Sequence, residues 1–362
     1  MALTLFDLKA LTEDKDKLRD FIIDYNLFFD FSDVNCFFCS GSIVRSKDSS
    51  RKSGFVWRCN SRNCRKIKLS EAFGSWFAKS HLELGKVLLL TYLWASGNVE
   101  CSFIRDQIGV SRQSVVDWEN FCREICIELL EDRNYSQIGG EGIIVEIDES
   151  KFGKRKYHRG KKVEGVWVFG GCERGNSQNS FFQVVENRST EVLEALIVKY
   201  IRKGSVIYSD CWKSYNTDRL EGLGYTHGTV NHSQHFKDPV SGVHTNTIES
   251  TWHHLKHFKH HRQSKELKAS YFAEFIFRRK FFRGDKSSLE YFSIFLREGI
   301  SKVYTKEKAI KLMQDKWGEG GSEGGLEGGL EGGSEGGSEG ASKRGSKRKG
   351  KQTGLNSKKQ KS

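Results

Sequence analysis

The chain has 362 residues, a formal net charge of +13 and an isoelectric point near 9.2, which favour a polyanionic partner such as nucleic acid. Its nine cysteines are too few and too unevenly placed for a disulfide scaffold, so we expect a reducing compartment. The longest apolar run, VLLLTYLWA, is far shorter than the ~20 residues of a membrane span. These features exclude a disulfide-rich secreted domain and a membrane partner.

The first part of the chain predicts a helical segment followed by a metal site. Residues 1–30 show apolar residues at helical spacing, and residues 31–70 hold four cysteines among basic and Ser-rich turns. The pattern is Cys36-x2-Cys39, nineteen residues, then Cys59-x4-Cys64. Each close pair can point two sulfurs at one ion, and Zn²⁺ takes four such ligands tetrahedrally. We therefore expect a structural Zn²⁺ in a zinc ribbon, with GFVWRC as a strand.

The segment 80–135 is helical by pattern and fits a helix-turn-helix. A first helix ends near Ile108, Gly109 makes the turn and Ser111 caps the second helix. Arg112 and Gln113 then lie at the exposed start of a recognition helix, where they would contact DNA. A plain helical hairpin without DNA contacts is the alternative.

Segment 141–300 changes to an α/β pattern. The runs GIIVEID, GVWVFGGCE, SFFQVVE and SVIYSD predict strands, and STEVLEALIVKYIRK predicts a helix before the last of them. This order favours a last strand parallel to the first. Helices are expected near 246–258, 266–282 and 286–298, after a looser stretch over 216–245.

Three carboxylates in this segment are candidate ligands. Asp148 and Asp210 each end a strand, and Glu249 precedes His253 and Lys256 on one stripe of a helix. Two aspartates on adjacent parallel strands plus a helical glutamate can hold two Mg²⁺ or Mn²⁺ ions, which prefer hard oxygen ligands. Glu149 is a rival for Asp148, because alternation leaves open which of the two points inward, and Glu146 is a weaker rival.

Basic residues follow the first strand. The run on a loop or hairpin that we expect to touch the DNA backbone comprises Lys154, Lys156, Arg159, Lys161 and Lys162. A solvated charged hairpin is the alternative. We also assign Lys256, on the helix of Glu249, to DNA contact.

The C-terminal part predicts a helix over 301–317 and a disordered segment over 318–362. The repeat GEGGSEGGLEGGLEGGSEGGSEG is too polar and too rich in glycine to order. It leads to KRGSKRKGK and KKQK, which are typical of a nuclear-localisation signal and predict the nucleus. A merely soluble basic tail is the alternative.

Taken together, residues 30–300 resemble the DDE transposases of the Merlin superfamily and their bacterial insertion-sequence relatives with an N-terminal zinc ribbon. The resemblance is carried by the four cysteines with WRC, and by SGNVECSFIRDQIGVSRQSVVDW, EIDESKFGKRKYHRGKKVEGVWVFGG, YSDCWKSY, HTNTIESTWHHLKH and FAEFIFRRKF. It implies a ribonuclease H-like catalytic core in which Asp148, Asp210 and Glu249 form the metal-binding triad. His244, Asn246 and Trp252 would support it without being ligands.

The expected function is therefore a DNA transposase. The resemblance implies binding of terminal inverted repeats and cut-and-paste movement of double-stranded DNA, from transposon ends into a target. A homo-oligomer is expected, because two ends must be brought together. The alternatives are a non-enzymatic, domesticated DNA-binding or regulatory protein, and a ribonuclease H-like nuclease without strand transfer.

Overall fold

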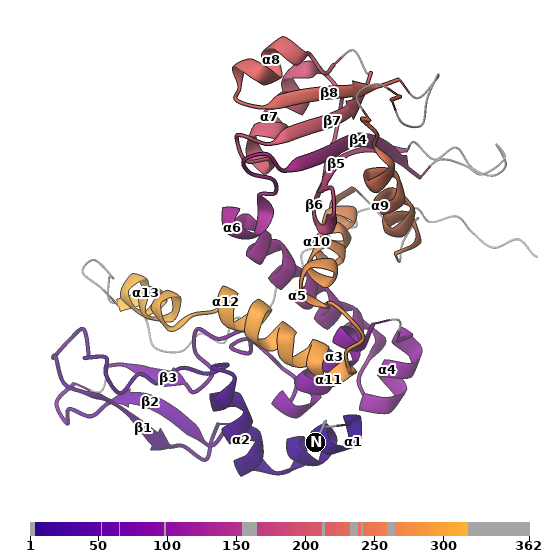
Figure 1. The fold of residues 1–362 in the computed structure, drawn as a ribbon. Coiled ribbons are helices and arrows are strands. Elements are labelled where there is room, and N and C mark those ends of the chain that lie inside the picture. Colours follow the sequence, from indigo (N-terminus) through magenta and orange to yellow (C-terminus); the bar gives the residue numbers. More distant parts are fainter. Residues whose placement is uncertain are drawn as a thin grey trace, which may run out of the picture. The chain divides into compact units, whose positions relative to one another are not determined.

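The computed structural model describes residues 4–51, 53–64, 66–97, 99–153, 165–211, 214–231, 238–239, 242–258 and 265–317 (Figure 1). The predicted linker and basic tail over 318–362, and the basic run over 154–162, lie outside the described residues. In the part of the chain that is described, no helix combines the length and apolar character needed to cross a lipid bilayer.

The N-terminal segment contains the two helices α1 (Leu5–Glu13) and α2 (Lys15–Asp24), as predicted for residues 1–30. Three short antiparallel strands follow in the order β1 (Ile43–Lys47), β2 (Phe55–Cys59) and β3 (Lys68–Ser70). Strand β2 ends at Cys59, as the GFVWRC motif predicts, so the chain enters the second pair of cysteines from a strand.

The helical segment contains α3 (Leu84–Ser96), α4 (Cys101–Ile108), α5 (Arg112–Glu131) and the short α6 (Arg133–Ser136). Gly109 adopts a left-handed conformation after α4, and the Ser111 hydroxyl accepts the Ser114 N–H at the start of α5. The predicted helix, turn and helix are therefore present.

A five-stranded sheet follows, in the order β6-β5-β4-β7-β8. Its strands are β4 (Ile144–Phe152), β5 (Val166–Glu173), β6 (Asn176–Val185), β7 (Val206–Asp210) and β8 (Thr226–Val230). Strand β5 is antiparallel to both neighbours, whereas β7 is parallel to β4 and β8 is parallel to β7. This topology is that of the ribonuclease H-like core that the sequence motifs imply.

Strand β8 and helix α8 (Thr217–Gly222) were not predicted, since we expected a looser stretch there. The segment THGTV has one glycine and a histidine and lacks an apolar alternation. It is a strand because β7 offers it an open parallel edge, with Val206 opposite Thr226 and Asp210 opposite Val230.

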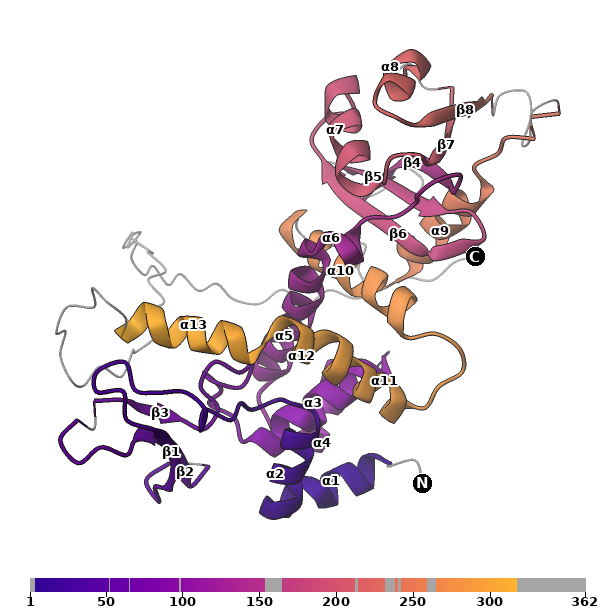
Figure 2. The same ribbon diagram turned by 60° about the vertical axis from the view of Figure 1, so that its left-hand side comes forward.

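Alternation along β4 places apolar side chains on both faces of the sheet, and helices cover both. On one face, Val145 and Ile147 pack with residues of α7 (Thr190–Tyr200) and with Leu220 of α8. On the other, Phe152 packs with α9 (Asn246–His257) and α10 (Lys265–Phe281). Figures 1 and 2 show α7 and α9 on opposite sides of the sheet.

The last helices pack on the N-terminal half of the chain. Helix α11 (Ser288–Ile294), the π-helical turn η2 (Phe295–Ile300) and α12 (Ser301–Val303) join the core formed by α3 and α5. Helix α13 (Lys306–Trp317) lies along the three-stranded sheet (Figure 2). Its Ala309 and Met313 belong to the same buried cluster as Trp57 of β2. The three-stranded sheet is therefore completed by a helix more than two hundred residues away in sequence.

Gly74 tests this packing. Its φ is +71°, and an added Cβ would come within 2.4 Å of the Ala309 Cβ. We predict that Gly74→Ala lowers the free energy of unfolding by about 2–4 kcal/mol, through backbone strain plus the clash with α13. Gly54→Ala is the matched control, because its φ is +74° but nothing lies within 4 Å of the added Cβ. It should cost about 1–2 kcal/mol. Equal losses in urea unfolding would show that α13 does not pack here.

Candidate active site and cysteine metal centre

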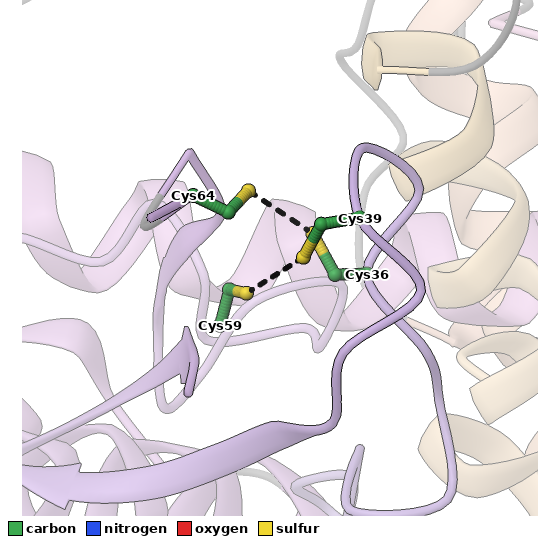
Figure 3. A group of neighbouring side chains, drawn as sticks. All are labelled: Cys36, Cys39, Cys59 and Cys64. Carbon is green, nitrogen blue, oxygen red and sulfur yellow. Dashed lines mark hydrogen bonds between the residues drawn. The ribbon is translucent and has the colours of Figure 1, made fainter. Parts of the chain in front are cut away.

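The four clustered cysteines converge on one point (Figure 3). Cys36 and Cys39 lie on the turn before β1, and Cys59 and Cys64 lie at the end of β2 and on the turn after it. Their Sγ atoms all lie within 4.8 Å of one another, with Cys36 to Cys64 at 3.7 Å and Cys39 to Cys59 at 3.5 Å. Sulfurs bound tetrahedrally to Zn²⁺ at about 2.3 Å are separated by about 3.8 Å. The cluster therefore has the dimensions of a four-thiolate metal site.

The thiols of this cluster differ in their readiness to lose a proton. Burial raises the pKa of Cys36 to about 12. A backbone hydrogen bond from Gly41 lowers the pKa of Cys39 to about 7. Since metal binding requires thiolates, a bound ion would have to displace the proton that burial holds on Cys36.

The two candidate aspartates lie side by side in the five-stranded sheet. Strands β4 and β7 are paired with Ile144 opposite Val206 and Glu146 opposite Tyr208. The hydrogen-bonded pairing stops there, and the same offset two residues further sets Asp148 level with Asp210, where β7 ends. The charge of Asp210 also contributes to the raised pKa of Asp148. Both aspartates therefore emerge on the same face of two adjacent parallel strands.

Asp148 and Glu149 point to opposite faces of the sheet. Trp252 of α9 donates its indole N–H to Asp148 Oδ2 at 2.9 Å, which places Asp148 on the α9 face. Glu149 instead accepts the Tyr215 hydroxyl, and Arg188 lies 3.8 Å from its other oxygen. The sequence left open which of these two residues points inward. In the structure Asp148, and not Glu149, shares a face with α9.

A glycine makes room for the indole that holds Asp148. Gly170 of β5 pairs directly with Asp148. A Cβ at this position would come within 2.7 Å of both the Trp252 ring and Phe182. The indole can therefore lie close against the sheet only because residue 170 has no side chain.

Burial raises the pKa of Asp148 to about 7, and the negative charges of Glu149 and Asp210 act in the same direction. The backbone N–H of Glu149 and the Trp252 indole oppose this shift. Burial also raises the pKa of Glu149, while its hydrogen bond from Tyr215 opposes the rise. The carboxylates of Asp148, Glu149 and Asp210 are thus close enough to repel one another, as carboxylates at a cation site do.

Glu249 lies in the first turn of α9 and is exposed. Among the described residues, only the four cysteines form a group whose ligand atoms all lie within 4.8 Å of one another. The three carboxylates therefore do not form one compact cage for a single ion. Two ions ~3.5–4 Å apart, each bound at about 2.1 Å, can take ligand atoms up to about 8 Å apart.

The three residues expected to support the carboxylates have different surroundings. Trp252 binds Asp148, as described above. The His244 Nδ1 lies 3.4 Å from the Asn246 N–H and 3.7 Å from Glu146 Oε1. Asn246 is the exposed first residue of α9.

The described residues assigned to DNA contact are exposed or half-exposed. Arg112 and Gln113 are exposed at the start of α5, and the Gln113 amide donates to Asp117 at 2.7 Å. Lys256 lies with its Nζ 5.6 Å from the centroid of the Phe152 ring. The other assigned cations, Lys154, Lys156, Arg159, Lys161 and Lys162, lie outside the described residues.

Sequence reasoning missed the buried partners of this site. Glu146, treated as a weak rival ligand, is fully buried and accepts hydrogen bonds from the start of α9 and from Arg174. Arg174 was not singled out at all. The available signal was a charged residue at position 146 amid apolar neighbours in a central strand, which requires a buried partner.

The region that contains these residues is similar to a known protein family. Residues 138–280 match the family described as ISXO2-like transposase domain. This match confirms the resemblance to insertion-sequence DDE transposases that the motifs carry. We found no match among curated proteins.

Several solved structures are similar over part of the chain. A chain of the simian T-cell lymphotropic virus intasome in complex with PP2A regulatory subunit B56 gamma is 13% identical, with a TM-score of 0.25. That alignment covers 51% of this chain and 64% of the other chain.

Two Mos1 structures are similar at the same level. The Mos1 transposase paired-end complex with left transposon end is 13% identical over 54% of this chain and 76% of that one, with a TM-score of 0.19. The pre-cleavage Mos1 transpososome is 12% identical over 62% and 78%, with a TM-score of 0.22. TM-scores this low carry no argument about the fold. The resemblance to transposases therefore depends on the family match over residues 138–280 and on the strand order of the sheet.

The raised pKa of Asp148 predicts a pH-dependent stability. The folded state holds the Asp148 proton more tightly than the unfolded chain does. The stabilisation that this bound proton gives the folded state is therefore present at low pH and is lost as pH rises through about 7. Without Mg²⁺ or Mn²⁺, we expect Asp148→Asn to exceed the parent protein in free energy of unfolding by about 1–3 kcal/mol at pH 8. The difference should shrink towards pH 4.5.

Urea unfolding at the two pH values measures this difference. Asp20→Asn, at an exposed position of α2, is the control and should show no such pH-dependent gain. Parallel stability curves for Asp148→Asn and the parent protein would contradict a repelled, buried carboxyl at position 148.

Proposed function

We propose that this chain is a DNA transposase, proceeding from the ISXO2-like transposase domain that residues 138–280 carry. The observation that carries the proposal is the placement of Asp148 and Asp210 on one face of adjacent parallel strands, with Glu249 in the first turn of the helix on that face. Such a set suits phosphoryl transfer on DNA, in which positioned carboxylates hold divalent cations.

In this proposal Asp148, Asp210 and Glu249 hold two Mg²⁺ or Mn²⁺ ions. Their donor atoms are the hard oxygens that these cations prefer. Bound there, the ions would activate a water or a 3′-hydroxyl and stabilise the leaving oxygen of an in-line displacement. The chain's own residues orient the ligands: Trp252 fixes one oxygen of Asp148, and Gly170 lets the indole approach.

Binding of DNA is assigned to the basic and helical parts of the chain. The four-cysteine ribbon would be held by Zn²⁺, and α5 would present Arg112 and Gln113 to the ends of the element. Lys256 and the basic run over 154–162 would contact the phosphate backbone. We further propose a homo-oligomer that pairs two ends, and a nuclear location directed by the basic tail.

Cleavage of DNA tests the proposal. On a DNA fragment that carries the genomic flanks of the gene, we expect Mg²⁺-dependent cutting at the element ends and joining of those ends to a plasmid. Asp148→Asn, Asp210→Asn and Glu249→Gln should each lower the rate by at least ~10³-fold, because the three carboxylates act as a unit. Glu221→Gln, at an exposed position of α8, is the control and should leave the rate unchanged.

The other outcomes separate the rival functions. Binding of the flanks without metal-dependent cutting would overturn the enzymatic proposal and favour a DNA-binding protein. Cutting of RNA–DNA hybrids without joining would favour a nuclease that lacks strand transfer.

Metal content tests the cysteine site. We expect close to one Zn²⁺ per chain by elemental analysis, and loss of that ion in Cys59→Ser, because each thiolate supplies one of four ligands. Cys101→Ser removes a half-buried thiol outside the cluster and should retain the ion. Retention of full zinc content in Cys59→Ser would disprove the assignment.

A further inference from the structure

Glu146 is a fully buried carboxylate in the centre of the sheet, two residues before Asp148 on the same face of β4. A buried carboxylate is tolerated only when hydrogen bonds or an opposite charge replace its hydration. Its Oε2 accepts the backbone N–H groups of Thr247 and Ile248 at 2.8 and 3.1 Å. Its Oε1 accepts the Thr247 hydroxyl at 2.9 Å and the Arg174 Nε–H at 2.8 Å.

These bonds cap helix α9 from a distant strand. The first amide groups of a helix have no partner within it and are normally satisfied by the side chain of the N-cap residue. The N-cap residue of α9, Thr245, makes no such side-chain bond. Glu146 supplies it instead, to the second and third residues of the helix, and its negative charge also suits the helix dipole. The start of α9 is thereby fixed to β4.

Arg174 extends this connection to the neighbouring strand. It lies on the turn between β5 and β6. In addition to its bond to Glu146, it donates a hydrogen bond from Nη2 to the His244 carbonyl oxygen at 2.6 Å. Its guanidinium also lies 4.7 Å from the centroid of the Tyr208 ring on β7. One arginine thus contacts β4, β7 and the segment that enters α9.

The three candidate metal ligands are all next to this network. Asp148 lies two residues beyond Glu146, and Asp210 lies two residues beyond Tyr208, in the same direction along parallel strands. Glu249 directly follows Ile248, whose amide Glu146 accepts. The network therefore connects β4, β7 and α9, which are the three elements that carry the candidate ligands.

We propose that Glu146 and Arg174 are positioning residues, which fix where Glu249 of α9 lies relative to Asp148 and Asp210. This inference rests on the proposed function. Carboxylates that repel one another before cations bind must be held by other contacts, and Mg²⁺ accepts only near-ideal octahedral geometry. Glu146 acts through α9, Arg174 acts through Glu146 and Tyr208, and neither is assigned a contact with the reacting DNA.

Glu146→Gln tests the proposal, because glutamine keeps the size of the side chain but removes one acceptor and the charge opposite Arg174. We expect kcat for DNA cleavage to fall ~10–100-fold and the half-saturating Mg²⁺ concentration to rise ~10-fold, as for other residues that orient metal ligands. Affinity for the DNA flanks, measured without cleavage, should stay within about twofold. Hydrogen exchange at the amides of Thr247 and Ile248 should accelerate.

Glu274→Gln is the matched control. Glu274 is also a buried glutamate paired with two arginines, Arg278 at 2.8 Å and Arg123 at 3.6 Å, but it lies on α10. Its loss should lower the melting temperature without changing kcat, the Mg²⁺ dependence or the exchange at α9. If Glu146→Gln does not fold, Arg174→Lys replaces it, since lysine keeps a cation but cannot also reach the His244 carbonyl in the same geometry.

The outcomes separate the inference from the proposed function. If the parent protein cuts DNA and Glu146→Gln behaves like Glu274→Gln, the positioning role is overturned and the transposase proposal stands. If the parent protein does not cut DNA, the transposase proposal fails, and the exchange measurement then decides only whether Glu146 fixes the start of α9. Unchanged protection of Thr247 and Ile248 then overturns it, whereas selective loss of protection supports it.

Discussion

The structure around the five-stranded sheet depends on one constraint. Strand β4 is covered by helices on both faces, yet three of its residues between positions 146 and 149 are acidic. Alternation assigns each acid to a face. Glu146 and Asp148 meet α9, and Glu149 meets Tyr215 on the opposite side. A buried carboxylate requires a partner wherever it points, so the strand imposes where α9 begins, where Trp252 lies and which residue at position 170 can be accommodated.

This constraint also explains why the two acids on the α9 face differ. Glu146 is saturated by two backbone amides, a hydroxyl and an arginine, so its charge is neutralised inside the protein. Asp148 has the Trp252 indole on one oxygen and negative neighbours at Glu149 and Asp210, so burial raises its pKa to about 7. A carboxyl that is only partly satisfied by the protein is suited to an external cation, whereas a fully satisfied one is suited to holding the structure together.

Much of this arrangement could be predicted from the sequence. Alternation and turn residues gave four of the five strands, and the parallel pairing of the strands that carry Asp148 and Asp210 followed from their order along the chain. The expected end of the first strand at Asp148 was wrong, because β4 continues to Phe152. The cysteine spacing gave a cluster that the structure brings together. The strand THGTV could not be predicted, because its pairing comes from the edge of β7 and not from its own composition.

The partners of buried charges were also beyond prediction. Glu146 and Thr247 are 101 residues apart, and no local pattern connects them. The same holds for Arg174 and the His244 carbonyl, which meet only when the sheet and α9 have formed. Sequence periodicity indicates which face a residue occupies, but the identity of its partner depends on the topology of the whole domain.

The packing of α13 on the three-stranded sheet has a consequence for synthesis and for gene rearrangement. Because Ala309 and Met313 lie in the same core as Ile43 and Trp57, the strands of the ribbon are translated long before the helix that completes their core. Its four clustered cysteines are all translated before residue 65, whereas its apolar core is finished only after residue 313. A recombination event that moved the three-stranded sheet to another gene would also have to move α13. Without that helix, the apolar surface of the sheet would be uncovered.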